Sequence, residues 1–201
     1  MTHGTGDLMM RNFRLAPLGV VGWLAVGGSA FAQTQLAPET PVTNTFGKWT
    51  TIVDVLDTGQ DASKTCAAST AFFDANGNSG TLTLSISTGD ALPPDAYPAI
   101  MLTVDNKELP TGKKIAATFG DPGVKVSATV YSNDAVIGRP SWTVDNQAKT
   151  SLALLRAMRQ VVSLDVTFGK QAFASIPMDG FTKAYRNLGT SCGFPTKDVA
   201  P

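Results

Sequence analysis

The sequence predicts a mostly β fold, an antiparallel β-sandwich or flattened barrel with two short covering helices at about 149–160 and 180–188. From residue 46 onward, Thr, Val, Ser and Ala are frequent and turn residues recur at short intervals. Several segments alternate apolar and polar residues, which is the period of a half-buried strand. Only two segments show the spacing of an amphipathic helix.

The clearest strand is TLTLSIST at 81–88, where Leu82, Leu84 and Ile86 alternate with threonine and serine. VKVSATVY at 124–131 repeats this pattern with valine and alanine on one face. Each such strand should bury one face and expose the other. Further strands are predicted at 48–56, 65–73, 98–105, 113–119, 140–144, 161–168 and 172–178.

The two helices are predicted from apolar residues three or four positions apart. In residues 149–160 these are Leu152, Leu155 and Met158. In the second helix we expect Asp179 to cap the N-terminus and Gly189 to end the helix. Its buried face should consist of Phe181, Ala184, Tyr185 and Leu188.

The first 32 residues have the features of a signal peptide. Arg11 and Arg14 precede an apolar run at 15–26, and Ala30-Phe31-Ala32 has the small-x-small pattern that signal peptidase recognises. The run contains glycines and is short for a membrane-spanning helix, the alternative interpretation. We therefore expect residues 1–32 to be a signal peptide. Behind it we expect a flexible leader at 33–45, a single β-rich domain at 46–195 and a tail at 196–201.

Export would place the protein in the periplasm. Removal of residues 1–32 leaves 14 basic and 15 acidic side chains, without a basic run. This balance argues against nucleic acid and against an electrostatic membrane anchor as partners. We expect a protein that is soluble, or held at a membrane only through another envelope protein.

The only histidine, His3, lies within the predicted signal peptide. Its removal would exclude catalysis and metal or haem ligation that need histidine, and we expect no cofactor and no enzymatic activity. The segment DANGNSG at 74–80 begins like a calcium loop but lacks its glycine and bidentate glutamate, so a hairpin turn at Asn76-Gly77 is the preferred interpretation. Most aspartates fall in turns, and no G-x-S-x-G motif is present.

Cys66 and Cys192 are the only cysteines, and both lie after the predicted cleavage site. In an oxidising compartment two such cysteines most simply form a disulfide bond. A loop of this length would gain roughly 4–5 kcal/mol in the chain-entropy model. Two free thiols or a thiolate metal site are the alternatives.

Five residues are candidates for contact with a partner protein. Tyr97 and Trp142, with Arg139, lie in segments that contain proline, and stiff backbone bearing aromatic and arginine side chains favours an interface. Alternatively, Tyr97 and Trp142 fill the ends of the core. Phe72 and Phe73 are adjacent on a predicted strand, so one of them must face away from the core.

The segments FGKWTT, SLALLRAMRQ followed by VVSLDVTF, and ASIPMDGFTKAYRNLGTSC, with a cysteine seventeen positions after Trp49, together resemble the invasion-associated locus B family of exported bacterial proteins. The resemblance spans roughly residues 46–192. It implies an exported, β-rich, non-enzymatic protein of the cell envelope, and it carries over no catalytic residue.

The function we expect is that of a non-catalytic periplasmic module that binds another envelope protein, as a small accessory or stabilising subunit. One specific form is the small third subunit of a membrane-bound quinohaemoprotein alcohol dehydrogenase. A different class is a periplasmic carrier that binds a lipid or saccharide between its sheets. An enclosed apolar cavity would favour the carrier, whereas a filled core with an exposed aromatic residue would favour the binding module.

Overall fold

The computed structural model describes residues 40–57, 61–89, 92–105, 112, 114–136 and 139–201. The description below concerns the unit formed by residues 36–201, within these described ranges. The predicted signal peptide at 1–32 and most of the predicted leader lie outside the described residues.

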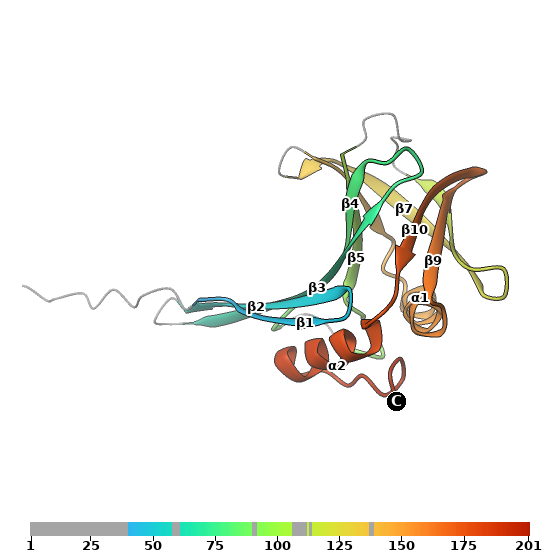
Figure 1. The fold of residues 1–201 in the computed structure, drawn as a ribbon. Helices are drawn as coiled ribbons and strands as arrows, with labels where there is room; N and C mark the ends of the chain where they lie inside the picture. Colours follow the sequence, from blue (N-terminus) through green and yellow to red (C-terminus); the bar gives the residue numbers. More distant parts are fainter. Residues whose placement is uncertain (1–39, 58–60, 90–91, 106–111, 113, 137–138) are drawn as a thin grey trace, which may run out of the picture. The chain divides into compact units, whose positions relative to one another are not determined.

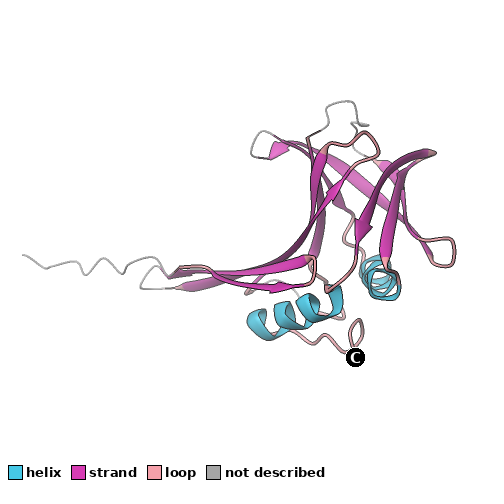
Figure 2. Ribbon diagram, in the orientation of Figure 1, coloured by secondary structure: helices cyan, strands magenta, loops and turns pink. Residues whose placement is uncertain are grey.

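Within the described residues, ten strands form one antiparallel sheet, accompanied by two helices (Figures 1 and 2). The order across the sheet is β1-β2-β3-β4-β5-β8-β7-β6-β9-β10. This confirms the predicted fold class, and a strand is found at each of the nine predicted places. The strands are β1 (Val42–Phe46), β2 (Trp49–Asp57), β3 (Ala62–Phe73), β4 (Ser79–Ser87), β5 (Ala99–Val104), β6 (Ile115–Gly120), β7 (Lys125–Val136), β8 (Arg139–Val144), β9 (Ser163–Phe168) and β10 (Gln171–Pro177), and the helices are α1 (Ala148–Gln160) and α2 (Phe181–Cys192).

The sheet curls so that β10 returns to the end of β3. Asp74 and Ala174 form an isolated antiparallel bridge, and the Ala75 amide donates a hydrogen bond of 2.7 Å to the Phe173 carbonyl. The β9–β10 register shifts between Ala172 and Ala174, which leaves Phe173 in a bulge. The bulge frees the Phe173 carbonyl from the β9–β10 ladder, and this carbonyl then closes the sheet. We call the contact between β3 and β10 the seam.

The interior beside the seam is filled by aromatic rings. Phe173 stacks on Phe168 with ring centroids 4.6 Å apart, and Trp142 lies 5.7 Å from Phe168. Phe72 contacts Phe173 edge-on at 5.7 Å. Such offset and edge-on pairs add to the gain from burying each ring.

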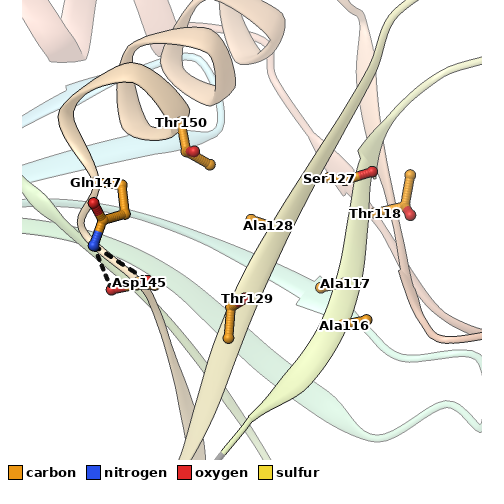
Figure 3. Close-up of a pocket in the computed structure, with 9 residues that line it drawn as sticks. All are labelled: Ala116, Ala117, Thr118, Ser127, Ala128, Thr129, Asp145, Gln147 and Thr150. Atoms are coloured by element: carbon orange, nitrogen blue, oxygen red, sulfur yellow. Dashed lines mark hydrogen bonds between the residues drawn. The ribbon is translucent and has the colours of Figure 1, made fainter.

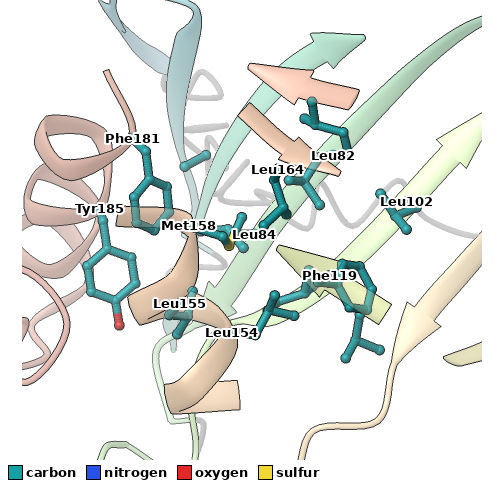
Figure 4. Close-up of a cluster of buried hydrophobic side chains, with 14 of the residues drawn as sticks. Leu82, Leu84, Leu102, Phe119, Leu154, Leu155, Met158, Leu164, Phe181 and Tyr185 are labelled. Carbon is teal, nitrogen blue, oxygen red and sulfur yellow. The ribbon is translucent and has the colours of Figure 1, made fainter. Parts of the chain in front are cut away.

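The two helices cover different parts of the sheet. α1 packs against β6, β7 and β9, whereas α2 packs against β1, β2 and β3. Figure 4 shows the buried side chains between helices and strands. Those contributed by the helices include Leu154, Leu155 and Met158 from α1 and Phe181, Ala184, Tyr185 and Leu188 from α2.

The ends of α2 differ from the prediction. Asp179 makes no side-chain cap, and the N-cap position is Gly180 at φ 91°. Gly189 does not end the helix; it is buried within it, and the helix continues to Cys192, with Gly193 at φ 76° as the C-cap. A Cβ atom at Gly189 would overlap with the Thr196 side chain, so glycine is needed here for close packing.

The predicted disulfide is confirmed. Cys192, at the end of α2, is bonded to Cys66 on β3, across a sequence separation of 126. The bond joins the last helix to the early part of the sheet. Both cysteines are buried.

The described part of the fold extends beyond the limits of 46–195 expected for the domain. β1 begins at Val42, inside the range expected to be a flexible leader. In the segment expected to be a tail, Val199 and Ala200 are buried. Carbonyl groups of this segment accept hydrogen bonds from arginines of both helices: Arg156 to Asp198, Arg159 to Val199, and Arg186 to Ala200 and Pro201.

Candidate interaction surface

The structure divides the five candidate partner-binding residues into two groups. Phe72, Tyr97 and Trp142 are at most 4% exposed. They contribute to the core, as the alternative interpretation proposed for Tyr97 and Trp142. Phe73 is 71% exposed, and the Arg139 side chain is 39% exposed. Only Phe73 and Arg139 therefore lie at the surface.

Tyr97 lies in the loop before β5, and it is buried by contacts with the C-terminal segment and with the residues before α1. Its hydroxyl donates a hydrogen bond of 2.5 Å to the Asp198 carboxylate, and its carbonyl accepts one from Asn146. Burial, and then the bond to Asp198, raise the Tyr97 pKa to about 12. The phenol is therefore neutral at ordinary pH and acts as a structural donor.

The fold brings Phe73 and Arg139 to the same end of the sheet. Phe73 on β3 is opposite Ser79 on β4. Arg139 on β8 holds Asp105 through bonds of 2.6 Å from Nε and 2.9 Å from Nη2, and Ser79 donates to the same carboxylate. Phe73 and Arg139 are thus linked across the strands through Ser79 and Asp105. We call Phe73, Ser79, Asp105 and Arg139 the Phe73 surface.

The charges on this surface are paired. Arg139 and Asp105 form a bidentate contact, with side chains 39% and 53% exposed. At such exposure the pair adds little to stability. It does neutralise the charge of Asp105, so the Phe73 ring stands near a neutral polar pair, a composition suited to a protein interface.

A hollow of about 480 Å³ adjoins Phe73 along the seam. Its apolar lining includes Phe73, Ala172 and Ala174, and its polar lining includes Asp165 and Ser175. The hollow exists because β10 contributes only alanine and serine to the outer side of the seam, so Phe73 has no large neighbour there.

Two aspartates line the same hollow, an arrangement that could suit a pair of catalytic acids. Asp74, however, turns its carboxylate to its own loop, where it accepts bonds from the Asn76 and Asn78 amides and from the Asn78 side chain. Asp165 accepts a bond of 2.6 Å from the Ser175 hydroxyl. Asp74 therefore organises the turn after β3. The turn is a loop built around Asp74, longer than the two-residue hairpin predicted at Asn76-Gly77.

A second hollow, of about 390 Å³, lies on the outer side of β6 and β7 beside the start of α1 (Figure 3). Short side chains such as Thr118, Ser127 and Thr129 line most of it. Its one carboxylate, Asp145, faces the Gln147 amide at 3.4 and 3.5 Å. This lining supplies neither a nucleophile with a base nor a pair of acids.

Within the described ranges no group of three or more His, Cys, Asp or Glu side chains could hold a metal ion. In the same part of the chain neither helix has the length and apolar character needed to cross a membrane. Comparison with protein-family models, curated proteins and solved structures finds no match to this chain.

Two partners of the candidate residues were not identified by sequence reasoning. Asp105 lies at the end of β5 and Asp198 in the segment expected to be a tail, 34 and 101 positions from the residues that they bind. Nothing in the local sequence pattern indicates such distant pairs. The adjacency of Phe72 and Phe73, by contrast, did indicate that one ring would face outward.

Proposed function

We propose that this protein is a non-catalytic, exported module of the cell envelope that binds another envelope protein through the Phe73 surface. The observation that carries the proposal is the 71% exposure of the Phe73 side chain beside an open hollow. A large exposed aromatic ring costs free energy in water, and it is the kind of residue that anchors protein interfaces.

The filled interior favours this function over that of a lipid or saccharide carrier. The rings of Phe72, Trp142, Phe168 and Phe173 occupy the space beside the seam where a ligand would lie between the sheet faces. The hollows beside Phe73 and beside α1 are open and lined mostly by short or polar side chains, such as Ala172 and Ser175 in the first and Thr118 and Ser127 in the second. A carrier would need an enclosed apolar cavity.

The composition gives further support. Outside the predicted signal peptide the chain has no histidine, which leaves few residues able to act as a base near neutral pH. The resemblance to the invasion-associated locus B family supports export and an envelope location. We propose that the protein acts as a small accessory or stabilising subunit, soluble in the periplasm or held at a membrane by its partner.

Affinity purification from detergent-solubilised envelopes tests this function with matched variants. The wild-type chain should retain one protein at a fixed ratio, and Phe73→Ser should lose most of it because the anchoring ring is removed. Val162→Ser is the control, since Val162 is 88% exposed on the loop before β9 and lies outside the Phe73 surface. This control should retain the partner fully.

Circular dichroism and thermal melting of both variants show whether the fold is kept. The proposal is wrong if the wild-type chain retains no protein at a fixed ratio. It is also wrong if folded Phe73→Ser and Val162→Ser retain the same amount as the wild type, because binding would then not involve Phe73.

A further inference from the structure

β1 is an open edge of the sheet. It pairs with β2 on one side, and among the described residues no strand pairs with its other side. At the opposite edge, β10 closes onto β3 through the seam. Open edges are normally protected by charged residues, an internal proline or a bulge. β1 (VTNTF) has none of these, and its register with β2 is continuous.

The hydrogen-bonding pattern shows which groups of β1 are free. The amide and carbonyl of Lys64 both bond to Thr88, on the β4 side of β3. The pair Val55–Lys64 is therefore not hydrogen-bonded between β2 and β3, so Val55 directs its groups to β1. The direction of the main-chain groups alternates from residue to residue along β2, and the register carries this alternation over to β1. The amides and carbonyls of Thr43 and Thr45 therefore point to the open edge.

We propose that β1 pairs in antiparallel orientation with β1 of a second copy of this chain. A two-fold axis beside Asn44 aligns Thr43 of one copy with Thr45 of the other, and these are the residues with free main-chain groups. The two symmetric pairs form four hydrogen bonds. The strand is thus complementary to itself in this register.

The side chains fit the same register. Val42 and Phe46 lie on the face of β1 towards α2, opposite Val53 and Trp49 of β2. In the proposed pair, Val42 of one copy lies opposite Phe46 of the other. Val42 is 60% exposed in the single chain, and pairing would cover it with a partly buried aromatic ring. No charged residue lies in Val42–Phe46, so two copies of the strand do not repel each other.

Charge variants on the opposite face of β1 test both the association and its register. Thr43→Glu with Thr45→Glu places glutamates directly opposite each other across the two-fold axis, and it should raise the dimer dissociation constant about tenfold or more. Thr43→Glu with Thr45→Lys places a glutamate opposite a lysine, and it should keep the dimer. Within a single chain, both variants face the same β2 residues, Ile52 and Thr50.

Sedimentation equilibrium of the purified full chain and both variants gives the dissociation constants, and circular dichroism with thermal melting confirms that each variant is folded. A wild-type chain that is monomeric at about 100 µM would overturn the proposal. Equal dimerisation of the two folded variants would overturn the register. Phe73→Ser should dimerise as the wild type does, so this result and that of the partner experiment are independent.

Discussion

Tyr97 and Asp198 lie 101 positions apart in the chain, and the Tyr97 hydroxyl donates a hydrogen bond of 2.5 Å to the Asp198 carboxylate. Arg156 on α1 donates to the carbonyl of the same aspartate. The loop before β5, helix α1 and the C-terminal segment therefore meet at one residue. This explains why a segment without regular structure has buried side chains at Val199 and Ala200.

The raised Tyr97 pKa predicts a pH dependence of stability. In the unfolded chain the phenol loses its proton near pH 10, whereas the folded state keeps it to about pH 12. The folded state therefore binds more protons in this window, and the free energy of unfolding should fall as the pH rises from 10 to 12. Below pH 10 the contribution is fully present.

Tyr97→Phe should flatten this decline, as measured by urea unfolding at several pH values. The pKa of Tyr185 is also raised, mainly by burial, so only the difference between wild type and variant reports on Tyr97. Parallel curves for the two proteins above pH 10 would contradict the prediction.

Phe72 and Phe73 are matched tests of the two sides of β3. Phe72 is 4% exposed and contacts Phe173, so Phe72→Ala should lower the free energy of unfolding by about 3–5 kcal/mol. Phe73→Ala should change it by less than about 0.5 kcal/mol, because the ring is 71% exposed. Urea unfolding of the two variants measures both values, and similar losses would mean that the sides are wrongly assigned.

Strands with a buried face could be predicted from the sequence, whereas β1 could not. Leu82, Leu84 and Ile86 alternate with polar residues because β4 has neighbours on both sides and a core beneath it. All residues of β1 except Phe46 are exposed, so the strand has no apolar alternation, and VTNT resembles a linker. Its pairing with β2 is a tertiary effect.

At the candidate surface, too, local sequence patterns predict some features and not those that depend on distant residues. Alternation along β3 requires Phe72 and Phe73 to face opposite sides, so the sequence predicts one exposed ring. For Tyr97 and Trp142 it leaves burial and exposure as alternatives, since the neighbours that bury them, Asp198 and Phe168, are distant in the chain. Gly189 likewise resembles a helix stop, and only its packing against Thr196 explains why it lies within α2.

The disulfide predicts a stability that depends on redox state. Cys192→Ser should lower the melting temperature of the oxidised protein, because the disulfide closes a long loop in the unfolded chain. In the chain-entropy model this closure stabilises the folded state by roughly 4–5 kcal/mol, and measured gains are often smaller. Under reducing conditions wild type and variant should melt alike. Calorimetry with and without a reductant measures this, and equal melting temperatures of the two oxidised proteins would contradict it.

Alanine substitutions at Gly180, the N-cap of α2, and at Gly77, in the turn after β3, distinguish the cost of backbone strain from the cost of close packing. Both have positive φ, 91° and 83°, so replacement by alanine costs each roughly 1–2 kcal/mol. At Gly180 the new Cβ would also overlap with the Phe46 carbonyl, whereas at Gly77 nothing lies within 4 Å. Gly180→Ala should therefore lose about 1–3 kcal/mol more than Gly77→Ala, because the turn between β1 and β2 must move away from α2. Urea unfolding gives both losses, and equal losses would show that the Gly180 contact with Phe46 adjusts freely.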